Sequence, residues 1–529
     1  MLAFASGLVF AASTPPTDIQ PGILIGLVGF ALALLFLDDG ARVVRAAGSH
    51  GFFFGLAANL FALRFVPEVM ARFTELPAVL GWIALVLLSA AQALPWAIGA
   101  AVAVWLARPP PASVRPKVPA SLAFAIGVFT ATFVPAVFPW TPAGGLARWP
   151  VLLQTAELVG ERGTSFLVAI ACALVADAIT RALCRHGANA RLRASAGPLA
   201  IGSIVFALLV VYGAIRMRAV DALRAAAPRA KVALLQPDFD ATFRWDERKA
   251  GLMMDRLSTL TKQAEGAGAV LTVWPESAYP YTLAHGVKRS PYGARAVLQN
   301  GVHGPVLTGA YLTKGGGVGT NSAILVDRNG AIGPSYDKRH LLWFGETVPL
   351  ADTFPVLRKV FARGTGLAPG SESVAFRSGP IVAAVLNCYE DTLPQAGREA
   401  MGPRPNLLVN VTNDAWFAGS AEGELHLRLA VLRSIEARRD LVRAVNRGPT
   451  SWVDAAGRVV ARHDPTPGLG ASPPLVADAA LLDSPLTLYT RFGDAPLVVL
   501  VVLAMAFAWT RRRLRGGREE PRASGRMAG

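Results

Sequence analysis

The chain consists of long apolar runs and one long stretch in which apolar and polar residues alternate. Eight runs approach the length needed to cross a hydrocarbon layer of about 30 Å, at residues 1–13, 21–37, 51–66, 76–107, 118–139, 164–183, 196–217 and 495–510. We interpret the first run as a retained helix rather than a removed signal peptide, because no basic region precedes it. Pro95 predicts a kink or tilt in the longest run. The sequence therefore predicts about eight membrane-spanning helices.

Lysine and arginine are unevenly distributed among the loops that connect these runs. Basic clusters follow the second, fourth, sixth and eighth runs, at residues 42–45, 108–117, 181–193 and 511–515, and the intervening loops hold few. Short loops rich in Lys and Arg remain in the cytoplasm. We therefore expect both termini to be cytoplasmic and the polar stretch, residues 218–494, to lie on the opposite side of the membrane.

This pattern predicts four segments. Residues 1–217 form a membrane domain of about seven transmembrane helices, 218–494 a polar domain outside the membrane, 495–511 a last transmembrane helix, and 512–529 a basic cytoplasmic tail. A content of 53% hydrophobic and 17% charged residues agrees with a protein embedded in lipid. Much of the net charge of +16 lies in the loops beside the membrane, where topology and anionic lipid explain it, so we expect no nucleic-acid partner.

The polar stretch alternates between strand and helix patterns. Short apolar runs bounded by Gly, Pro, Asn or Asp predict strands at 231–236, 269–274, 305–311, 321–326, 381–387 and 406–411. Residues 250–266 and 422–438 predict helices, and 327–330 and 454–457 predict hairpin turns. The expected fold is a strand-rich α/β sandwich. No Gly-x-Gly-x-x-Gly motif follows a strand, so we expect no dinucleotide cofactor.

Three reactive side chains each lie just beyond a short apolar run, where active sites of layered α/β folds are common: Glu276, Lys338 and Cys388. Taken singly, each has a structural explanation. Glu276 can begin a helix after Pro275, Lys338 can lie in a solvated loop, and a buried cysteine is often a small core residue.

Together the three form a complete apparatus for acyl transfer. Cys388 would attack a carbonyl carbon, Glu276 would take the thiol proton, and Lys338 would stabilise the developing oxyanion. A serine hydrolase is disfavoured, because the domain has no Gly-x-Ser-x-Gly elbow.

The remaining cysteines and histidines do not predict a metal centre. Cys172 and Cys184 lie in or beside an apolar run, and with Cys388 they form an odd, sparse set that does not suggest a disulfide framework or a metal cluster. His340 and His426 are too isolated in the sequence to form a metal site. We expect neither a metal nor another cofactor.

Four motifs carry a family resemblance. WPES around Glu276, DKRHL and FGE around Lys338, NCYED around Cys388, and NVTNDAWF at 410–417 resemble the nitrilase superfamily. With eight apolar runs, the chain specifically resembles the apolipoprotein N-acyltransferases of bacterial envelopes. The resemblance implies a multi-span α-helical membrane domain in the bacterial inner membrane, with an α/β nitrilase-like αββα sandwich on its periplasmic side.

The resemblance also implies a two-step reaction without a cofactor. The sn-1 acyl chain of a phospholipid passes to Cys388 as a thioester, and then to the α-amino group of the diacylglyceryl-cysteine that begins an apolipoprotein. The enzyme would act as a monomer.

Supporting roles follow from the same resemblance. Glu346 would assist the triad, Tyr389 and Glu390 would shape the pocket, and Trp245 would lie near the substrate entrance. The NVTNDAWF segment and the helix after it either line the cleft or form a capping turn, with Asn413, Asp414, Trp416, Phe417 and His426.

Two other functions are compatible with parts of the sequence. A membrane-anchored nitrilase-type amidase would use the same triad with water as the acceptor, and would acylate without amine-dependent turnover. A transporter or receptor with a degenerate domain would need intramembrane charges, of which the runs hold few, Arg64 and Asp177 being the clearest. We also expect apolar residues in 343–350 and 354–367 to form arms that contact lipid.

Overall fold

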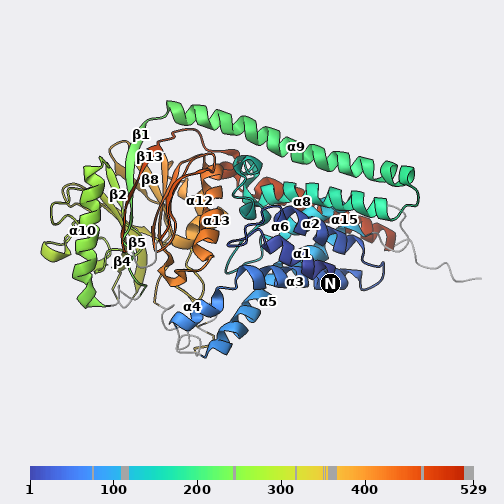
Figure 1. Cartoon of the computed structure of the whole chain (residues 1–529), viewed down its shortest axis with the longest axis horizontal. Coiled ribbons are helices and arrows are strands. Elements are labelled where there is room, and N and C mark those ends of the chain that lie inside the picture. Colours follow the sequence, from blue (N-terminus) through green and yellow to red (C-terminus); the bar gives the residue numbers. More distant parts are fainter. Residues whose placement is uncertain are drawn as a thin grey trace, which may run out of the picture.

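The computed structural model describes all residues except 74–76, 109–117, 242–245, 316–317, 349–350, 352, 356–365, 466–469 and 517–529. The described residues form a helical bundle and an α/β domain, which lie side by side along the long axis of the molecule (Figure 1).

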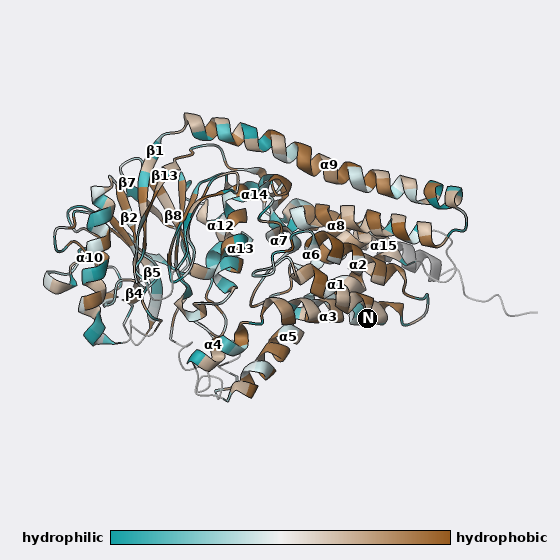
Figure 2. Ribbon diagram, viewed as in Figure 1, coloured by the Kyte–Doolittle hydropathy of each residue, from teal (hydrophilic) through white to brown (hydrophobic). Residues whose placement is uncertain are grey.

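Each predicted apolar run forms a helix. The helices of the bundle are α1 (Leu2–Ala11), α2 (Gly22–Leu35), α3 (Val43–Ala62), α4 (Val66–Phe73), α5 (Ala78–Ala107), α6 (Ala120–Ala131), α7 (Pro142–Gly145), α8 (Ala156–Leu183), α9 (Ala188–Ala226) and α15 (Ala495–Gly516). Hydrophobic residues dominate most of these helices, and hydrophilic residues are frequent in the α/β domain, in α4 and toward the ends of α9 (Figure 2). The helix α5 continues through Pro95.

Among the described residues, fewer helices than the predicted eight have the full length of a membrane span. By length and composition, α5, α8 and α9 qualify, and the bent pair α3–α4 adds a fourth. The runs at 1–13, 21–37 and 118–139 form helices of 10, 14 and 12 residues. They are shorter than their apolar runs because turns and prolines take up the remaining residues.

Glycine allows the bundle helices to approach closely. A Cβ atom added to Gly99 in α5 would lie 2.4 Å from the carbonyl oxygen of Gly127 in α6, and one added to Gly127 would lie equally close to that of Gly99. Small residues at such crossings are typical of helices that pack within membranes.

The α/β domain contains two sheets. The first has the order β13-β1-β2-β4-β5-β6, with β3 also beside β4, and the second the order β12-β11-β10-β9-β8-β7. The first contains β1 (Arg229–Gln236), β2 (Leu271–Val273), β3 (Thr282–Ala284), β4 (Val306–Thr313), β5 (Gly319–Val326), β6 (Tyr336–Asp337) and β13 (Ser472–Ala480). The second contains β7 (Ala375–Ser378), β8 (Ile381–Asn387), β9 (Leu407–Asn413), β10 (Leu441–Asn446), β11 (Thr450–Val453) and β12 (Val459–His463). In both sheets parallel strands in the centre are flanked by antiparallel ones.

Helices cover the outer faces of the two sheets. The helix α10 (Ala250–Gly266) packs on the first sheet, and α12 (Pro394–Ala400) and α13 (Glu422–Ala437) pack on the second (Figure 1). Buried side chains from both sheets, such as Val232 and Val409, form the core between them. The short helix α14 (Leu488–Phe492) leads back to the bundle. This is the αββα sandwich that the sequence resemblance implied.

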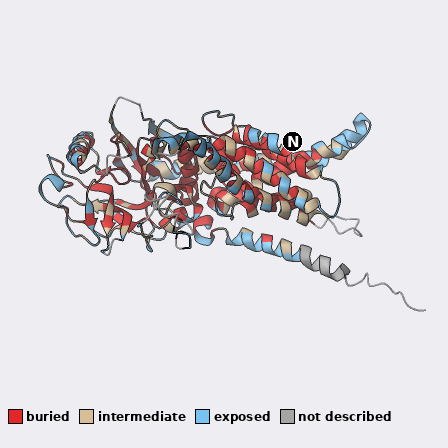
Figure 3. Ribbon diagram, turned by 90° about the horizontal axis from the view of Figure 1, so that it is seen from below, coloured by how far each residue is buried: buried red, intermediate tan, exposed pale blue. Residues whose placement is uncertain are grey.

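Buried ion pairs join the sandwich to the bundle. The Arg433 Nη2 atom in α13 lies 2.6 Å from Glu161 Oε2 in α8, and Arg438 Nε lies 2.7 Å from Glu157 Oε2. Buried residues continue from one part into the other (Figure 3). Because these charges are withdrawn from water and compensate one another, the contact fixes the sandwich on one end of the bundle.

Candidate active site

The structure brings together the three residues predicted to perform the chemistry. Glu276 follows β2, Lys338 directly follows β6, and Cys388 directly follows β8. Lys338 Nζ lies 3.5 Å from Glu276 Oε1, and the charges of both groups act on the Cys388 thiol. Glu276 is 8% exposed and Lys338 is 1% exposed. The site therefore lies where strand ends of the two sheets meet, largely shielded from water.

A turn of unusual backbone geometry presents the nucleophile. Cys388 has a φ of +52°, in the left-handed region that favours glycine, and begins the 3-10 helix η6 (Cys388–Thr392). Asn410 Nδ2 donates hydrogen bonds to the carbonyl oxygens of Leu386 (3.1 Å) and Cys388 (3.2 Å). A non-glycine residue in this region costs about 1–3 kcal/mol, and such positions concentrate at functional sites.

Glu390 anchors this turn. Its buried carboxylate accepts hydrogen bonds from the backbone N–H groups of Asn387 (2.8 Å), Arg339 (2.8 Å) and His340 (3.0 Å), and from the Tyr336 hydroxyl (2.8 Å). Burial raises the pKa of Glu390, and the backbone donors oppose that rise. Glu390 thus connects the nucleophile turn to the segment that follows Lys338.

Lys338 lies between two carboxylates. Its Nζ atom is 2.7 Å from Glu346 Oε2 and 3.5 Å from Glu276 Oε1. Burial alone would lower the pKa of Lys338, but the charges of Glu346 and Glu276 hold it well above its ordinary value. Burial would raise the pKa of Glu346, yet Lys338 and the Leu342 N–H hold it below its ordinary value. The ammonium and the Glu346 carboxylate are therefore both charged at neutral pH.

The Cys388 thiol is neutral at rest. Burial raises its pKa well above the ordinary value, Glu276 raises it further, and Lys338 opposes the rise only in part. A neutral thiol is a weak nucleophile, so the reaction needs a base. Glu276 is the carboxylate whose charge acts most strongly on the thiol, which suits it to accept the proton.

The other predicted site residues are distributed around this centre. Tyr389 is half-buried, and burial raises its pKa to about 12, although the Lys338 charge opposes this. The backbone N–H of Asn413 donates to Glu276 Oε2 at 3.0 Å, and its side chain caps the 3-10 helix η7 (Asp414–Phe417). Trp416 is half-buried in η7. Trp245 lies outside the described residues.

The prediction that His426 is isolated was wrong. His426 Nε2 lies 2.8 Å from Asp391 Oδ1 and its Nδ1 lies 3.2 Å from Asp414 Oδ1, while Arg443 Nε lies 2.8 Å from Asp391 Oδ2. Helix α13 brings the histidine to η6 and η7, a tertiary contact that spacing does not reveal.

This cluster has the donor types of a divalent-cation site. Ligand atoms of Asp414, Glu422 and His426 all lie within 4.8 Å of one another. Burial alone would lower the pKa of His426, but the charges of Asp391 and Asp414 outweigh burial and raise this pKa well above its ordinary value. Burial raises the pKa of Glu422 to about 8. In the folded chain these protons, together with Arg443, offset part of the negative charge that the acidic side chains bring to the cluster.

Buried amide side chains are the components that sequence reasoning missed. Asn321, Asn387 and Asn410 are at most 1% exposed and bond to the catalytic groups or to the nucleophile turn. A buried amide requires partners. The sequence offered one signal for these buried amides. An asparagine lies at the edge of or inside an apolar strand, as in NSAILV and LLVNVT.

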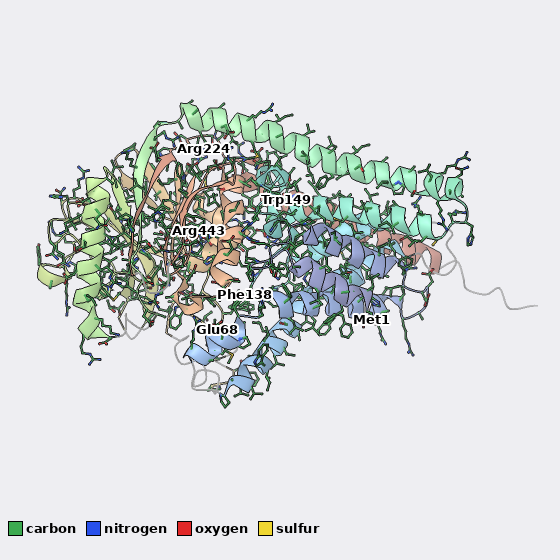
Figure 4. All side chains as sticks on the ribbon, viewed as in Figure 1. Met1, Glu68, Phe138, Trp149, Arg224 and Arg443 are labelled. Atoms are coloured by element: carbon green, nitrogen blue, oxygen red, sulfur yellow. The ribbon has the colours of Figure 1, made fainter. Side chains whose placement is uncertain are left out.

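One edge of the site contacts the bundle. The Phe417 ring in η7 lies 5.8 Å from Phe65, which follows α3, and Phe65 lies 5.8 Å from Phe138. Arg72 in α4 donates a hydrogen bond to the Ala418 carbonyl. Figure 4 shows Phe138 and Glu68 where the bundle meets the sandwich. The NVTNDAWF segment therefore lies between the catalytic residues and the helices.

Comparison with known proteins covers both parts of the chain. Residues 6–174 match the apolipoprotein N-acyltransferase N-terminal domain, and residues 231–470 match the carbon-nitrogen hydrolase family. An apolipoprotein N-acyltransferase of Geobacter metallireducens is 30% identical over 510 residues, which cover 93% of this chain and 91% of the relative. One of Bradyrhizobium diazoefficiens is 33% identical over 398 residues, 71% and 70% of the two chains. Among solved structures, an amidase from Nesterenkonia sp. shares 20% identity at a TM-score of 0.36, covering 51% of this chain and 97% of the amidase.

Proposed function

The chain belongs to the apolipoprotein N-acyltransferase family, and we propose that it performs this acyl transfer through a thioester on Cys388. It is a membrane acyltransferase that acts on lipid and on lipoprotein. In detail, we propose that a phospholipid donates its sn-1 acyl chain. The acceptor is the α-amino group of an N-terminal S-diacylglyceryl-cysteine.

The first half-reaction acylates the enzyme. Glu276 accepts the proton of the Cys388 thiol while Sγ bonds to the ester carbonyl carbon of the phospholipid. Negative charge develops on the carbonyl oxygen, beside the Lys338 ammonium. The bond between the acyl carbon and the glycerol oxygen then breaks, and Glu276 returns its proton to that oxygen, so a lysophospholipid leaves.

The second half-reaction passes the acyl group to the lipoprotein. The neutral α-amino group attacks the thioester carbon, and Lys338 again stabilises the oxyanion. The carbon–sulfur bond breaks, and Glu276 transfers a proton from the amine to the departing sulfur. The products are an amide on the lipoprotein and the free Cys388 thiol.

One observation carries the assignment of roles. A buried ammonium, Lys338, is shared by Glu276 and Glu346 beside a neutral thiol. This arrangement provides a base for the thiol and a fixed positive charge for the oxyanion, both shielded from water, where electrostatic stabilisation is strong.

The contact between site and bundle supports a membrane donor. A phospholipid is held in its bilayer by about 0.8 kcal/mol per buried methylene, so the site must lie at the membrane. The Phe65–Phe417 contact places one edge of the site against the bundle.

We further assign the sandwich to the periplasmic side of the inner membrane and both termini to the cytoplasm. Arg428 in α13 donates to the Ser13 carbonyl at 3.1 Å, so the loop after α1 faces the sandwich. Arg108, in the loop after α5, pairs with Asp39, in the loop after α2. These two loops carry basic clusters, at 108–117 and 42–45, from which we predict a cytoplasmic side. The proposed monomer consists of the bundle at 1–217, the catalytic domain at 218–494, the helix at 495–511 and the tail at 512–529.

The decisive experiment is intact-mass analysis of the full chain in detergent after incubation with phospholipid. The native protein should gain one acyl chain, sensitive to hydroxylamine, and Cys388→Ser should gain none. Cys184→Ser, the same change at an exposed cysteine, should acylate like the native chain. A folded native protein that acquires no adduct would exclude the thioester mechanism.

The same experiment separates this function from an amidase. A diacylated lipopeptide with a free α-amino group should discharge the adduct and gain the acyl chain. Discharge by water at the same rate with and without the lipopeptide would instead indicate a hydrolase.

A further inference from the structure

Asn321 lies at the meeting point of the three catalytic segments. It belongs to β5, is 1% exposed, and its carbonyl oxygen accepts a hydrogen bond from the backbone N–H of Lys338 at 2.8 Å. The strand is thus bonded directly to the residue that supplies the positive charge.

The Asn321 side chain uses both ends of its amide. Its Nδ2 atom donates to Glu276 Oε1 and to Glu346 Oε1, each at 2.7 Å. Its Oδ1 atom accepts from Asn387 Nδ2 at 3.1 Å, on the residue before the nucleophile. The amide therefore contacts the base, the partner of Lys338 and the strand that carries Cys388.

The partners fix the orientation of this amide. An ionised carboxylate accepts hydrogen bonds and has none to donate, so the NH₂ group of Asn321 must face Glu276 and Glu346. The reversed orientation would place a carbonyl oxygen against both carboxylates. The two short donor contacts are therefore the arrangement that electrostatics demands.

One cation does not compensate two carboxylates. Lys338 lies closer to Glu346 than to Glu276, at 2.7 against 3.5 Å, and like charges in a buried site repel strongly. The amide of Asn321 supplies the second pair of donors. Without it, the two carboxylates would move apart or take up a proton.

We propose that Asn321 is a positioning residue for acyl transfer, which holds Glu276 and Glu346 in place on either side of Lys338. The inference rests on the proposed thioester mechanism, because it assigns Asn321 to the same triad. Its action is indirect: Glu276 and Lys338 touch the reacting atoms, and Asn321 sets where their charges lie.

The consequence is a change in the pH dependence of acylation. The Asn321 donor is one of the groups that hold the pKa of Glu346 low, together with Lys338 and the Leu342 N–H. Among the described residues, Glu346 faces the Lys338 ammonium at 2.7 Å and acts on the Cys388 thiol, and Glu276 lies 3.5 Å from the same ammonium. Replacing the donor by an acceptor makes the Glu346 carboxylate hold its proton more tightly, so acylation should fail at a higher pH than in the native enzyme.

The test compares Asn321→Asp with the native chain in single-turnover acylation of Cys388, followed by intact mass between pH 5 and 9. The maximal rate should fall about 10²-fold, and the acid limb of the rate profile should move up by about one pH unit. Asn329→Asp, the same change in an exposed turn, serves as the matched control and should follow the native profile.

Rescue distinguishes positioning from loss of structure. In the double variant Asn321→Asp with Glu346→Gln, the new amide can donate to the new carboxylate, which restores one hydrogen bond and the net charge. It should acylate about tenfold faster than Asn321→Asp alone. If Asn321→Asp fails to fold, Asn321→Ser, which is neutral and smaller, undergoes the same pH series.

The results test the positioning role of Asn321 separately from the thioester mechanism. A native rate and profile in Asn321→Asp, or a uniform loss at every pH without rescue, would overturn the positioning role while leaving the Cys388 thioester intact. Absence of an adduct on the native chain would instead count against the mechanism itself.

Discussion

Lys338 is the residue on which the charge balance of the site depends. It is almost fully buried, and it is the cation that lies within 4 Å of both Glu276 and Glu346 among the described residues. Without the ammonium, two buried carboxylates would face each other and the oxyanion would lose its positive partner.

At this scale we expect Lys338→Met to lower the acylation rate of Cys388 by about 10²–10³-fold. Its free energy of unfolding should fall by about 3–5 kcal/mol, because two buried charges lose their partner. Single-turnover acylation and thermal unfolding in detergent measure the two effects. Lys288→Met, at an exposed lysine, is the control. Acylation at the native rate by Lys338→Met would remove the lysine from the mechanism.

At the scale of elements, α13 and the turns η6 and η7 form one buried charge cluster behind the nucleophile. Glu422, at the start of α13, faces Asp414, His426, Arg443 and Asp391. Burial, followed by Asp414, raises the pKa of Glu422 from 4.5 to about 8. Its protonated form is therefore the one that the fold favours.

A pH dependence of stability follows. The folded pKa is raised, so the contribution of Glu422 is fully present below pH 4.5 and is lost as the pH rises through about 8. Glu422→Gln, which mimics the protonated form, should lose less stability than the native chain between pH 5 and 9. Denaturant unfolding at each pH measures this difference. Parallel curves for the two proteins would show that Glu422 does not titrate in this range.

The loop after Lys338 carries two exposed aromatic residues beside the site. Trp343 and Phe344 are 41% and 42% exposed, and the apolar arm at 343–350 stays a prediction. Most of the second predicted arm, including residues 356–365, lies outside the described residues.

Replacing Trp343 and Phe344 with serine should slow turnover on phospholipid vesicles by about tenfold, because less apolar surface enters the bilayer. Thioester formation with a short soluble ester should change far less. Tyr292→Ser, at an aromatic residue that is 83% exposed on another loop, is the control. An equal loss with both donors would contradict a lipid-contacting role.

At the scale of the whole molecule, buried ion pairs hold the sandwich on the bundle. Arg433 in α13 reaches Glu161 in α8 at 2.6 Å and also lies 3.0 Å from Glu436. The same helix carries His426 toward the nucleophile turn. The contact therefore aligns the site with the membrane helices.

We expect Arg433→Met to lower the free energy of unfolding by about 3–5 kcal/mol, since it leaves the buried Glu161 carboxylate without the cation that pairs with it. Turnover on vesicles should fall more than acylation by a soluble ester, because alignment with the bilayer is lost. Arg377→Met, at an exposed arginine of β7, should change the free energy of unfolding by no more than about 0.5 kcal/mol. It should leave both activities at the native level. Unchanged stability would mean that this ion pair does not hold the two parts together.

Much of the architecture follows from local patterns. The strands at 231–236 and 381–387 and the helix at 250–266 lie where the sequence predicts them, because burial periodicity and turn residues act over a few positions. The motifs around Glu276, Lys338 and Cys388 indicate the family for the same reason. The edge strands β7 and β13 were not predicted, since their pairing and not their own periodicity holds them in the sheets.

The sequence by itself determined the fold class, the apolar helices and the family, and it predicted three reactive side chains. The tertiary structure alone decided that Lys338 lies closer to Glu346 than to Glu276, that Asn321 bonds to both carboxylates, and that His426 joins two aspartates. The reason is physical. Helix and strand patterns are local, but hydrogen bonds and Coulomb interactions depend on distances between atoms that are remote in sequence, and only packing sets those distances.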